Sequence, residues 1–467
     1  MNSNRTVTPT PHVYRKRFFD PALLPLVVLI MAKRRIAVAT VTASLLAVAV
    51  TAVTQPWIRP HIRTVAARSA PVASASPASS TKSGPTEATS APHLIVGSDA
   101  PPSHSTPLDL QAELDATRNN GGGVVAIPVG NWSLASTVNV WANITLQGNG
   151  RQSCLIMRQP GLDLLNIAGS NVTLQNFCMV GPGGVAAHGG NGPGRGIVNL
   201  NKMQSLQSVL IQNLQISFTQ GHAIELYGSA RAHLHNLTVA GNIISRAGGH
   251  GVVMGFTDGG RVDSNLVVES ALGGMAYGDG AINIEGSSAL TIENNTVDGS
   301  MYSGIQANTL SGSLVKNNTV TNTHGSGFAF WNCSGNTFLG NTSTGNSDQG
   351  FYWAVNVSLP GAAGNNLIQS NVAQGNGKNG FQLAQQTGVR FIGNTATDNN
   401  ADNAALWSGL MIQQHSASIQ VSGNVFQNSK SGQGQMFGVG APDTTTSGLS
   451  IGPDNNYLRM RQQNVYP

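Results

Sequence analysis

The stretch TIENNTVDGSMYSGIQANTLSGSLVKNNTVTNTHGSGFAFWNCSGNTFLGN, residues 291–341, contains one phrase three times. Each copy is a short apolar strand that ends in asparagine, at Asn295, Asn318 and Asn341. These asparagines are 23 residues apart, and a glycine between each pair opens another short strand. Two or three strands in 23 residues without a helix predict one coil of a parallel β-helix.

The same pattern extends through most of the chain. Ten phrases end in asparagine, at positions 176, 213, 236, 265, 295, 318, 341, 371, 394 and 424. A second column consists of glycines, at positions 221, 251, 280, 304, 327, 350, 380 and 409. After the first gap the asparagines are 23, 29 or 30 residues apart, so only particular turns vary in length, as in a coil of fixed circumference.

Other repeat folds fit this pattern less well. Leucine-rich repeats share the period but need a leucine scaffold, and propeller blades need about 40 residues. We therefore expect an all-β, single-stranded parallel β-helix. Equivalent side chains of adjacent coils would lie about 4.8 Å apart, so the asparagines would form a ladder of hydrogen-bonded amides.

Composition and charge exclude several classes of protein. Of the 467 residues, 56 are glycine and only 10% are charged, which argues against helical bundles and coiled coils. Residues 1–68 carry ten basic residues and one acidic residue, a net charge of +9. Residues 69–467 carry 15 basic and 19 acidic residues, a net charge of −4. The basic charge belongs to the N-terminal tail, so we expect no nucleic-acid partner.

Three cysteines, Cys154, Cys178 and Cys333, are too few for a disulfide framework and match no zinc signature. A pairing of Cys154 with Cys178 stays open, although the two do not fall in the same column of the repeat.

The N-terminal part of the chain predicts export. Lys33-Arg34-Arg35 precedes an apolar run, so residues 31–54 are interpreted as a signal peptide or an uncleaved signal anchor, and residues 1–30 as an upstream extension. Residues 55–106, rich in Ala, Ser, Pro and Thr, are interpreted as a linker. We expect a secreted, periplasmic or cell-surface protein, in contact with a membrane only through the N-terminal segment if that segment stays uncleaved.

The start of the repeat carries a family resemblance. The segment LDLQAELDATRNNGGGVVAIPVGNWSLASTVNVWANITLQG (108–148) resembles the N-terminal capping helix and first coil of the pectin-lyase-like right-handed β-helix superfamily. The resemblance covers residues 107–457 and leaves 458–467 as a tail. It implies a right-handed helix with a cap, in a superfamily of polysaccharide lyases, glycoside hydrolases, epimerases and non-catalytic adhesins or tailspikes.

The strands after the glycine column alternate, so one face packs into the core and the other is exposed. Residues one and three after glycine are apolar and predict core stacks: Ile305, Phe328, Phe330, Phe351, Trp353, Phe381, Leu383, Leu410 and Ile412. The expected outer face carries amides, acids and two aromatic rings: Glu225, Asn283, Glu285, Gln306, Asn308, Trp331, Tyr352, Gln382 and Gln413. Amides and flat rings suit sugars, although a merely solvated sheet would look similar.

Acids, histidines and a tyrosine near this face are candidates for catalysis: Glu285, Asp279, His250, Glu225 and Tyr302. We expect substrate binding by Trp331, Tyr352, Asn283, Gln306, Asn308, His324 and Lys378. Glu225 and Glu285 would lie two rungs, about 9–10 Å, apart. Gly249-His250-Gly251 is similar to a motif of the polygalacturonase family, whose aspartate motifs are missing here; alternatively, His250 is a turn residue.

These features favour an exported enzyme that cleaves glycosidic bonds of an extracellular or cell-wall polysaccharide, as a hydrolase or a lyase. The alternatives are a non-catalytic glycan-binding or structural protein and a C5 epimerase. No cofactor and no metal site are expected, except calcium in the case of a lyase.

Overall fold

A computed structural model describes residues 106–185, 192–273, 280–356, 358, 363–401, 407–462 and 465–466. The expected N-terminal extension, signal segment and linker, apart from Thr106, lie outside these residues. Among the residues that are described, no helix is long and apolar enough to span a bilayer.

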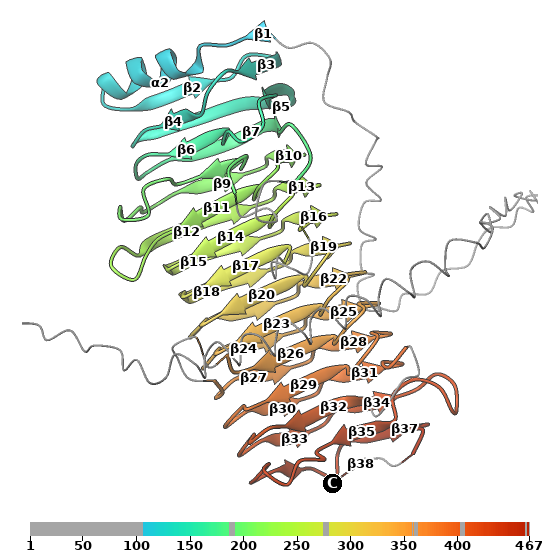
Figure 1. The fold of residues 1–467 in the computed structure, drawn as a ribbon. Helices are drawn as coiled ribbons and strands as arrows, with labels where there is room; N and C mark the ends of the chain where they lie inside the picture. Colours follow the sequence, from blue (N-terminus) through green and yellow to red (C-terminus); the bar gives the residue numbers. More distant parts are fainter. Residues whose placement is uncertain are drawn as a thin grey trace, which may run out of the picture. The chain divides into compact units, whose positions relative to one another are not determined.

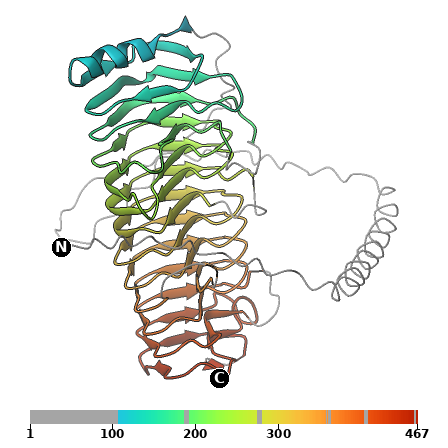
Figure 2. The ribbon, with the colours of Figure 1, turned by 60° about the vertical axis from the view of Figure 1, so that its left-hand side comes forward.

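The chain winds into coils that stack from the N-terminal to the C-terminal end (Figure 1), and all the strands within both sheets pair in parallel. The same stack is visible after a 60° rotation (Figure 2). The expected parallel β-helix is therefore confirmed.

One side of the coils is a 13-stranded sheet. Its strands are β4 (Val138–Val140), β6 (Leu165–Ile167), β8 (Ile197–Val198), β11 (Ile224–Tyr227), β14 (Val252–Gly255), β17 (Ile282–Glu285), β20 (Ile305–Asn308), β23 (Phe328–Trp331), β26 (Phe351–Ala354), β29 (Phe381–Ala384), β32 (Ser408–Gln413), β35 (Phe437–Gly440) and β38 (Val465–Tyr466).

The other strands form a 25-stranded sheet in two columns, which β5 (Ile144–Met157) and β7 (Thr173–Val180) join. The first column contains β2 (Gly123–Ala126), β9 (Leu210–Gln212), β12 (Leu234–Ala240), β15 (Thr257–Asp263), β18 (Ser288–Glu293), β21 (Leu314–Lys316), β24 (Thr337–Leu339), β27 (Leu367–Gln369), β30 (Arg390–Ile392), β33 (Gln420–Ser422) and β36 (Ser450–Ile451). The second contains β1 (Thr106–Pro107), β3 (Gly130–Leu134), β10 (Gln215–Ser217), β13 (Ile243–Ser245), β16 (Leu266–Val268), β19 (Thr296–Asp298), β22 (Thr319–Thr321), β25 (Thr342–Thr344), β28 (Val372–Gln374), β31 (Thr395–Thr397), β34 (Val425–Gln427) and β37 (Asn456–Leu458).

The predicted core stacks are confirmed. Phe328, Phe351 and Phe381 are buried and occupy one register column of the 13-stranded sheet. The ring centroids of Phe328 and Phe351 are 4.5 Å apart, and those of Phe351 and Phe381 are 4.8 Å apart. Stacking at the strand spacing thus fills the interior with aromatic rings in van der Waals contact.

The asparagine ladder is confirmed, with a different membership. Seven of the ten predicted residues belong to it, from Asn265 to Asn424, and Asn242 and Asn455 extend it at its two ends. Successive side chains are joined by Nδ2–H···Oδ1 bonds of 2.8–3.2 Å.

Three predicted ladder members lie elsewhere. Asn176 and Asn213 have positive φ (58° and 53°) and stand one residue before the ladder position. In the coil after Asn213, the residue equivalent to Asn213 is Gly241. Asn236 lies within β12, six residues before the true member. An asparagine at the end of the repeated phrase does not by itself identify the ladder position, because asparagine also favours the left-handed turn beside the ladder.

A capping helix, α2 (Leu110–Asn119), covers the N-terminal end of the stack (Figure 1). Leu110 and Leu114 face the first coils and are buried, and the Asp109 side chain accepts a hydrogen bond from the backbone N–H of Ala112. This element matches the expectation from the family resemblance.

Cys154 and Cys178 form a disulfide. The expectation that they stand in different columns is wrong, because β5 and β7 are long strands whose register shifts between Gly150 and Cys154 and brings the two residues opposite each other.

Candidate functional site

The outer face of the 13-stranded sheet has two columns of side chains. Tyr227, Gly255, Glu285, Asn308 and Trp331 follow one another in one column. The other column contains Glu225, Val253, Asn283, Gln306, Ala329 and Tyr352. Glu225 is therefore equivalent to Asn283, and not to Glu285 as the glycine column suggested.

This face is less exposed than expected. Glu225, Asn283 and Gln306 are buried, as is Gln382, whereas Glu285 and Asn308 are half-buried. The amides cover one another: Gln306 Nε2 donates to Asn283 Oδ1 at 3.1 Å, and Asn283 Nδ2 donates to Glu285 Oε1 at 2.9 Å. These hydrogen bonds fix the orientation of the Glu285 carboxylate.

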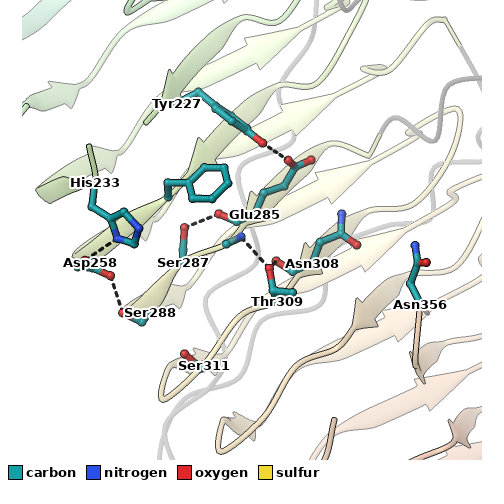
Figure 3. Close-up of a pocket in the computed structure, with 12 residues that line it drawn as sticks. Tyr227, His233, Asp258, Glu285, Ser287, Ser288, Asn308, Thr309, Ser311 and Asn356 are labelled. Carbon is teal, nitrogen blue, oxygen red and sulfur yellow. Dashed lines mark hydrogen bonds and ion pairs between the residues drawn. The ribbon is translucent and has the colours of Figure 1, made fainter. Parts of the chain in front are cut away.

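A pocket of about 610 Å³ lies where the 13-stranded sheet turns into the first column of the 25-stranded sheet (Figure 3). On one side Tyr227 donates a hydrogen bond to Glu285 Oε2. On the other side Asp258 contacts His233 Nδ1 at 2.7 Å and accepts from Ser288 Oγ at 2.7 Å. The pocket, here called the large pocket, thus contains two carboxylates in separate hydrogen-bond networks.

Gly255 allows Tyr227 to reach Glu285. The two side chains belong to coils that are separated by the coil of Gly255. A Cβ atom at position 255 would lie 2.4 Å from Cδ2 of Tyr227, so the ring rests on bare backbone. Burial, and then the hydrogen bond to Glu285, raise the pKa of Tyr227, so its hydroxyl stays protonated and donates.

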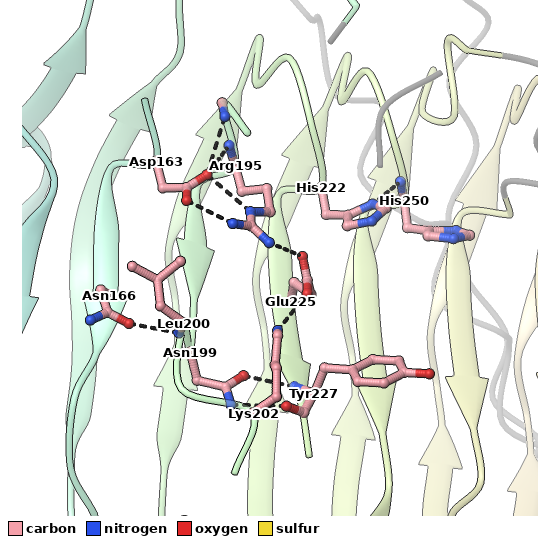
Figure 4. A network of polar contacts seen from close by, with 11 residues as sticks. Asp163, Asn166, Arg195, Asn199, Leu200, Lys202, His222, Glu225, Tyr227 and His250 are labelled. Atoms are coloured by element: carbon pink, nitrogen blue, oxygen red, sulfur yellow. Dashed lines mark hydrogen bonds and ion pairs between the residues drawn. The ribbon is translucent and has the colours of Figure 1, made fainter. Parts of the chain in front are cut away.

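A cluster of ion pairs continues along the sheet from the large pocket (Figure 4). Arg195 contacts Asp163 and Glu225, each at 2.8 Å, and Lys202 contacts Glu225 at 2.5 Å. Burial alone would raise the pKa of Glu225, but Lys202 and Arg195 together lower it. Glu225 consequently stays ionised, which does not suit a general acid.

His222 and His250 stack beside this cluster, with ring centroids 4.8 Å apart. The His250 backbone N–H donates to His222 Nδ1 at 2.9 Å, and His250 Nδ1 lies 2.7 Å from the carbonyl oxygen of Gly280. Burial lowers the pKa of both histidines, so both rings are neutral at neutral pH. Asp279, the expected partner of His250, lies outside the described residues.

The aromatic candidates line a second cavity of about 200 Å³, here called the aromatic pocket. The rings of Trp331 and Tyr352 meet edge to face, with centroids 6.2 Å apart, and Tyr302 and Asp348 complete the wall. Burial, and then Asp348, raise the pKa of Tyr302, which does not favour a role as a base.

Two expected binding residues lie apart from these walls. Lys378 forms an ion pair with Asp348 at 2.5 Å, behind the aromatic pocket. His324 is exposed and is not among the described residues that line either pocket. No group of three or more His, Cys, Asp or Glu side chains that could hold a metal ion occurs within the described parts of the chain.

The sequence reasoning missed Tyr227, His233, Asp258, Arg195 and Lys202. An alignment of the strands on their buried residues, in place of the glycines, would have found Tyr227. Leu226, Met254 and Ile284 share one register column but lie five, three and four residues after the preceding glycine, so the glycine column misplaces the outer face by one or two residues.

Similarity to known proteins agrees with this fold. The family described as right handed beta helix region matches residues 195–359 and 280–447, which together span 253 of the 467 residues. No curated protein matches the chain in sequence.

Three solved structures are similar to this chain. A GH87 α-1,3-glucanase from Streptomyces thermodiastaticus is 18% identical over 76% of this chain and 69% of its own catalytic unit, with a TM-score of 0.55. The Dettilon tailspike protein is 15% identical over 78% of this chain and 65% of its own, with a TM-score of 0.53. The A-module of an Azotobacter vinelandii mannuronan C-5 epimerase is 16% identical over 77% of this chain and 92% of its own, with a TM-score of 0.48.

At these identities the likeness concerns the fold alone, which a glucanase shares with a tailspike protein. The stacked parallel coils and the match over more than half of the sequence agree: the chain belongs to the right-handed β-helix family.

Proposed function

We propose that the protein is an exported enzyme that cleaves glycosidic bonds of an extracellular polysaccharide, with Glu285 at the centre of the chemistry. The observation that carries this proposal is the wall of the large pocket. There the Glu285 carboxylate accepts from both Tyr227 and Asn283 and stands across from a second carboxylate, Asp258. Cleavage of a glycosidic bond commonly uses two groups on either side of the bond, and here these are Glu285 and the pair of Asp258 with His233.

The neighbouring side chains support a polymer that lies along the axis of the β-helix. Glu285, Asn308 and Trp331 stand on three successive rungs, so Trp331 is about 9–10 Å from Glu285 along the axis. The amide of Asn308 can bind hydroxyl groups, and the Trp331–Tyr352 pair offers a flat apolar surface for a sugar ring. Bond cleavage would then occur at the large pocket and sugar binding at the aromatic pocket.

The disulfide supports the export part of the proposal. Disulfides persist in oxidising compartments outside the cytosol, where a wall or matrix polysaccharide would also be found. The basic cluster and apolar run over residues 31–54 agree with this location.

The test is a panel of neutral and acidic polysaccharides, assayed for new reducing ends and for the absorbance of unsaturated uronate products. Glu285→Gln should lower kcat at least about 100-fold on any polymer that the wild type cleaves, with an unchanged Tm. Glu113→Gln, an exposed change on α2, is the matched control and should keep full activity.

Absorbance without hydrolysis would identify a lyase, and a change of sugar configuration without new ends an epimerase. Full activity of Glu285→Gln would remove Glu285 from the site. Binding that Trp331→Ala abolishes, with no turnover of any polymer, would instead support a non-catalytic glycan-binding protein, and the enzyme proposal would fail.

A further inference from the structure

We infer that His233, oriented by Asp258, is the second proton-transfer group of the large pocket, and that the pocket performs hydrolysis through a covalent intermediate on Glu285. This inference rests on the proposed function and deepens it. It assigns separate tasks to Glu285 and His233, and it makes Asp258 a positioning residue.

The hydrogen bonds fix the state of the imidazole. Burial alone would raise the pKa of Asp258, but the Ser288 hydroxyl and His233 lower it, so Asp258 is an acceptor. The contact of 2.7 Å with Asp258 Oδ2 therefore holds a proton on His233 Nδ1. The other ring nitrogen, Nε2, is left on the edge of the ring away from Asp258. A carboxylate that fixes the tautomer of a histidine in this way is a common support for proton transfer.

His233 and Glu285 approach the same space from different coils. His233 directly precedes β12, and Asp258 and Ser288 occupy the next two coils in register with each other. The large pocket is lined by both His233 and Glu285 (Figure 3), and Phe256 also lines it. The Phe256 ring centroid is 6.0 Å from that of His233 and 5.5 Å from that of Tyr227, so an apolar floor joins the two polar walls.

Glu285 has the environment of a nucleophile. Two donors, Tyr227 Oη and Asn283 Nδ2, each bind one of its carboxylate oxygens. Donors to both oxygens hold the carboxylate in one orientation, as an attacking carboxylate requires. His233 Nε2 then supplies the acid and base steps.

The reaction balances in two steps. First, Glu285 bonds to the anomeric carbon as the bond from that carbon to the leaving oxygen breaks, and the leaving oxygen takes a proton from protonated His233 Nε2. Second, water gives a proton to Nε2 while its oxygen bonds to the anomeric carbon, and Glu285 leaves as a carboxylate. The net change is addition of one water molecule, with retention of the anomeric configuration.

The test uses the full chain and the polymer on which the wild type is active. His233→Gln and Asp258→Asn should each lower kcat by about 10²–10⁴-fold with little change in KM. Imidazole added to His233→Ala should restore part of the activity, which a merely structural role would not allow. His415→Gln, an exposed change on a distant coil, is the matched control and should be unaffected.

NMR of the first product should show the retained anomer. An inverted product, or full activity of His233→Gln while Glu285→Gln is inactive, would overturn this inference and leave the proposed function intact. An unchanged Tm, or rescue by imidazole, separates loss of chemistry from loss of fold. If the wild type cleaves no polymer, both the proposed function and this inference fail.

Discussion

At the scale of single residues, the absence of a side chain shapes the site as much as the side chains present. Tyr227 and Glu285 are two rungs apart, too far for neighbours in a sheet to touch over an ordinary residue. Gly255 between them leaves the space in which the tyrosine ring lies.

Gly255→Ala should therefore act as a remote substitution of Tyr227. The new Cβ would lie 2.4 Å from the ring, and Gly255 is outside the left-handed region, so the ring has to move and the backbone does not. Loss of one hydrogen bond to a charged group is worth about 1.5–3 kcal/mol, so kcat should fall roughly ten- to a hundredfold.

A double-mutant cycle with Tyr227→Phe checks this mechanism through kcat on the cleaved polymer. If Gly255 acts through Tyr227, the double variant should be about as slow as Tyr227→Phe alone. Additive losses would show that Gly255 contributes by another route.

The candidate residues show where sequence reasoning stops. Glu285 and the Trp331–Tyr352 pair lie on the predicted face, because alternation within a strand is a local property. The partners of Glu285 were not predictable in this way. Tyr227 depends on the lateral register, and Arg195 and Lys202 come from the irregular connections before and after β8.

At the scale of the element, the asparagine ladder holds the turns between the two columns of the 25-stranded sheet. Asn318 shows the complete pattern: its Oδ1 accepts from the backbone N–H and Nδ2 of Asn295, and its Nδ2 donates to Ile292 O and Asn341 Oδ1. Every polar atom of this buried amide thus has a partner, as burial requires.

Asn318→Ala should cost about 2–5 kcal/mol in the free energy of unfolding. It removes the acceptor of the Asn295 backbone N–H and Nδ2 and the donor to Ile292 O, whereas Asn341 Oδ1 keeps the backbone N–H of residue 318. Each buried group left unpaired costs about 1–3 kcal/mol, with partial relief by water. Denaturant unfolding followed by circular dichroism measures the loss.

Asn317→Gly is the matched control for this prediction. Asn317 is exposed with a φ of 53°, at the position where the next coil has Gly340, so the change should stay within about 0.5 kcal/mol. Equal losses in the two variants would mean that the ladder contributes no more than the turn itself.

The elements themselves were largely predictable, because a 23-residue period with strands on both sides of an asparagine has few solutions. The boundaries of the ladder were not. Asparagine satisfies both a buried amide position and the exposed left-handed position beside it, so Asn176 and Asn213 mimic the ladder without belonging to it.

At the scale of the whole molecule, the stability of stacked coils is a sum of contacts between neighbours, with few contacts across the stack. The disulfide between Cys154 and Cys178 joins β5 to β7 near the N-terminal end of the stack, two coils before the coil of Tyr227 and His233. Its effect should therefore remain at the N-terminal end, where fraying would otherwise begin.

The double variant Cys154→Ala, Cys178→Ala tests this view. A bond that closes 24 residues of sequence contributes about 3 kcal/mol to the stability of the coils that it joins. Hydrogen exchange should become faster in β5 and β7 and stay unchanged in β14 and β17, and activity at Glu285 should persist. Equal acceleration in all four strands would show that the coils unfold as one cooperative unit. In that case the cap and its disulfide would stabilise the site as well as the end of the stack, because no coil could open without the others.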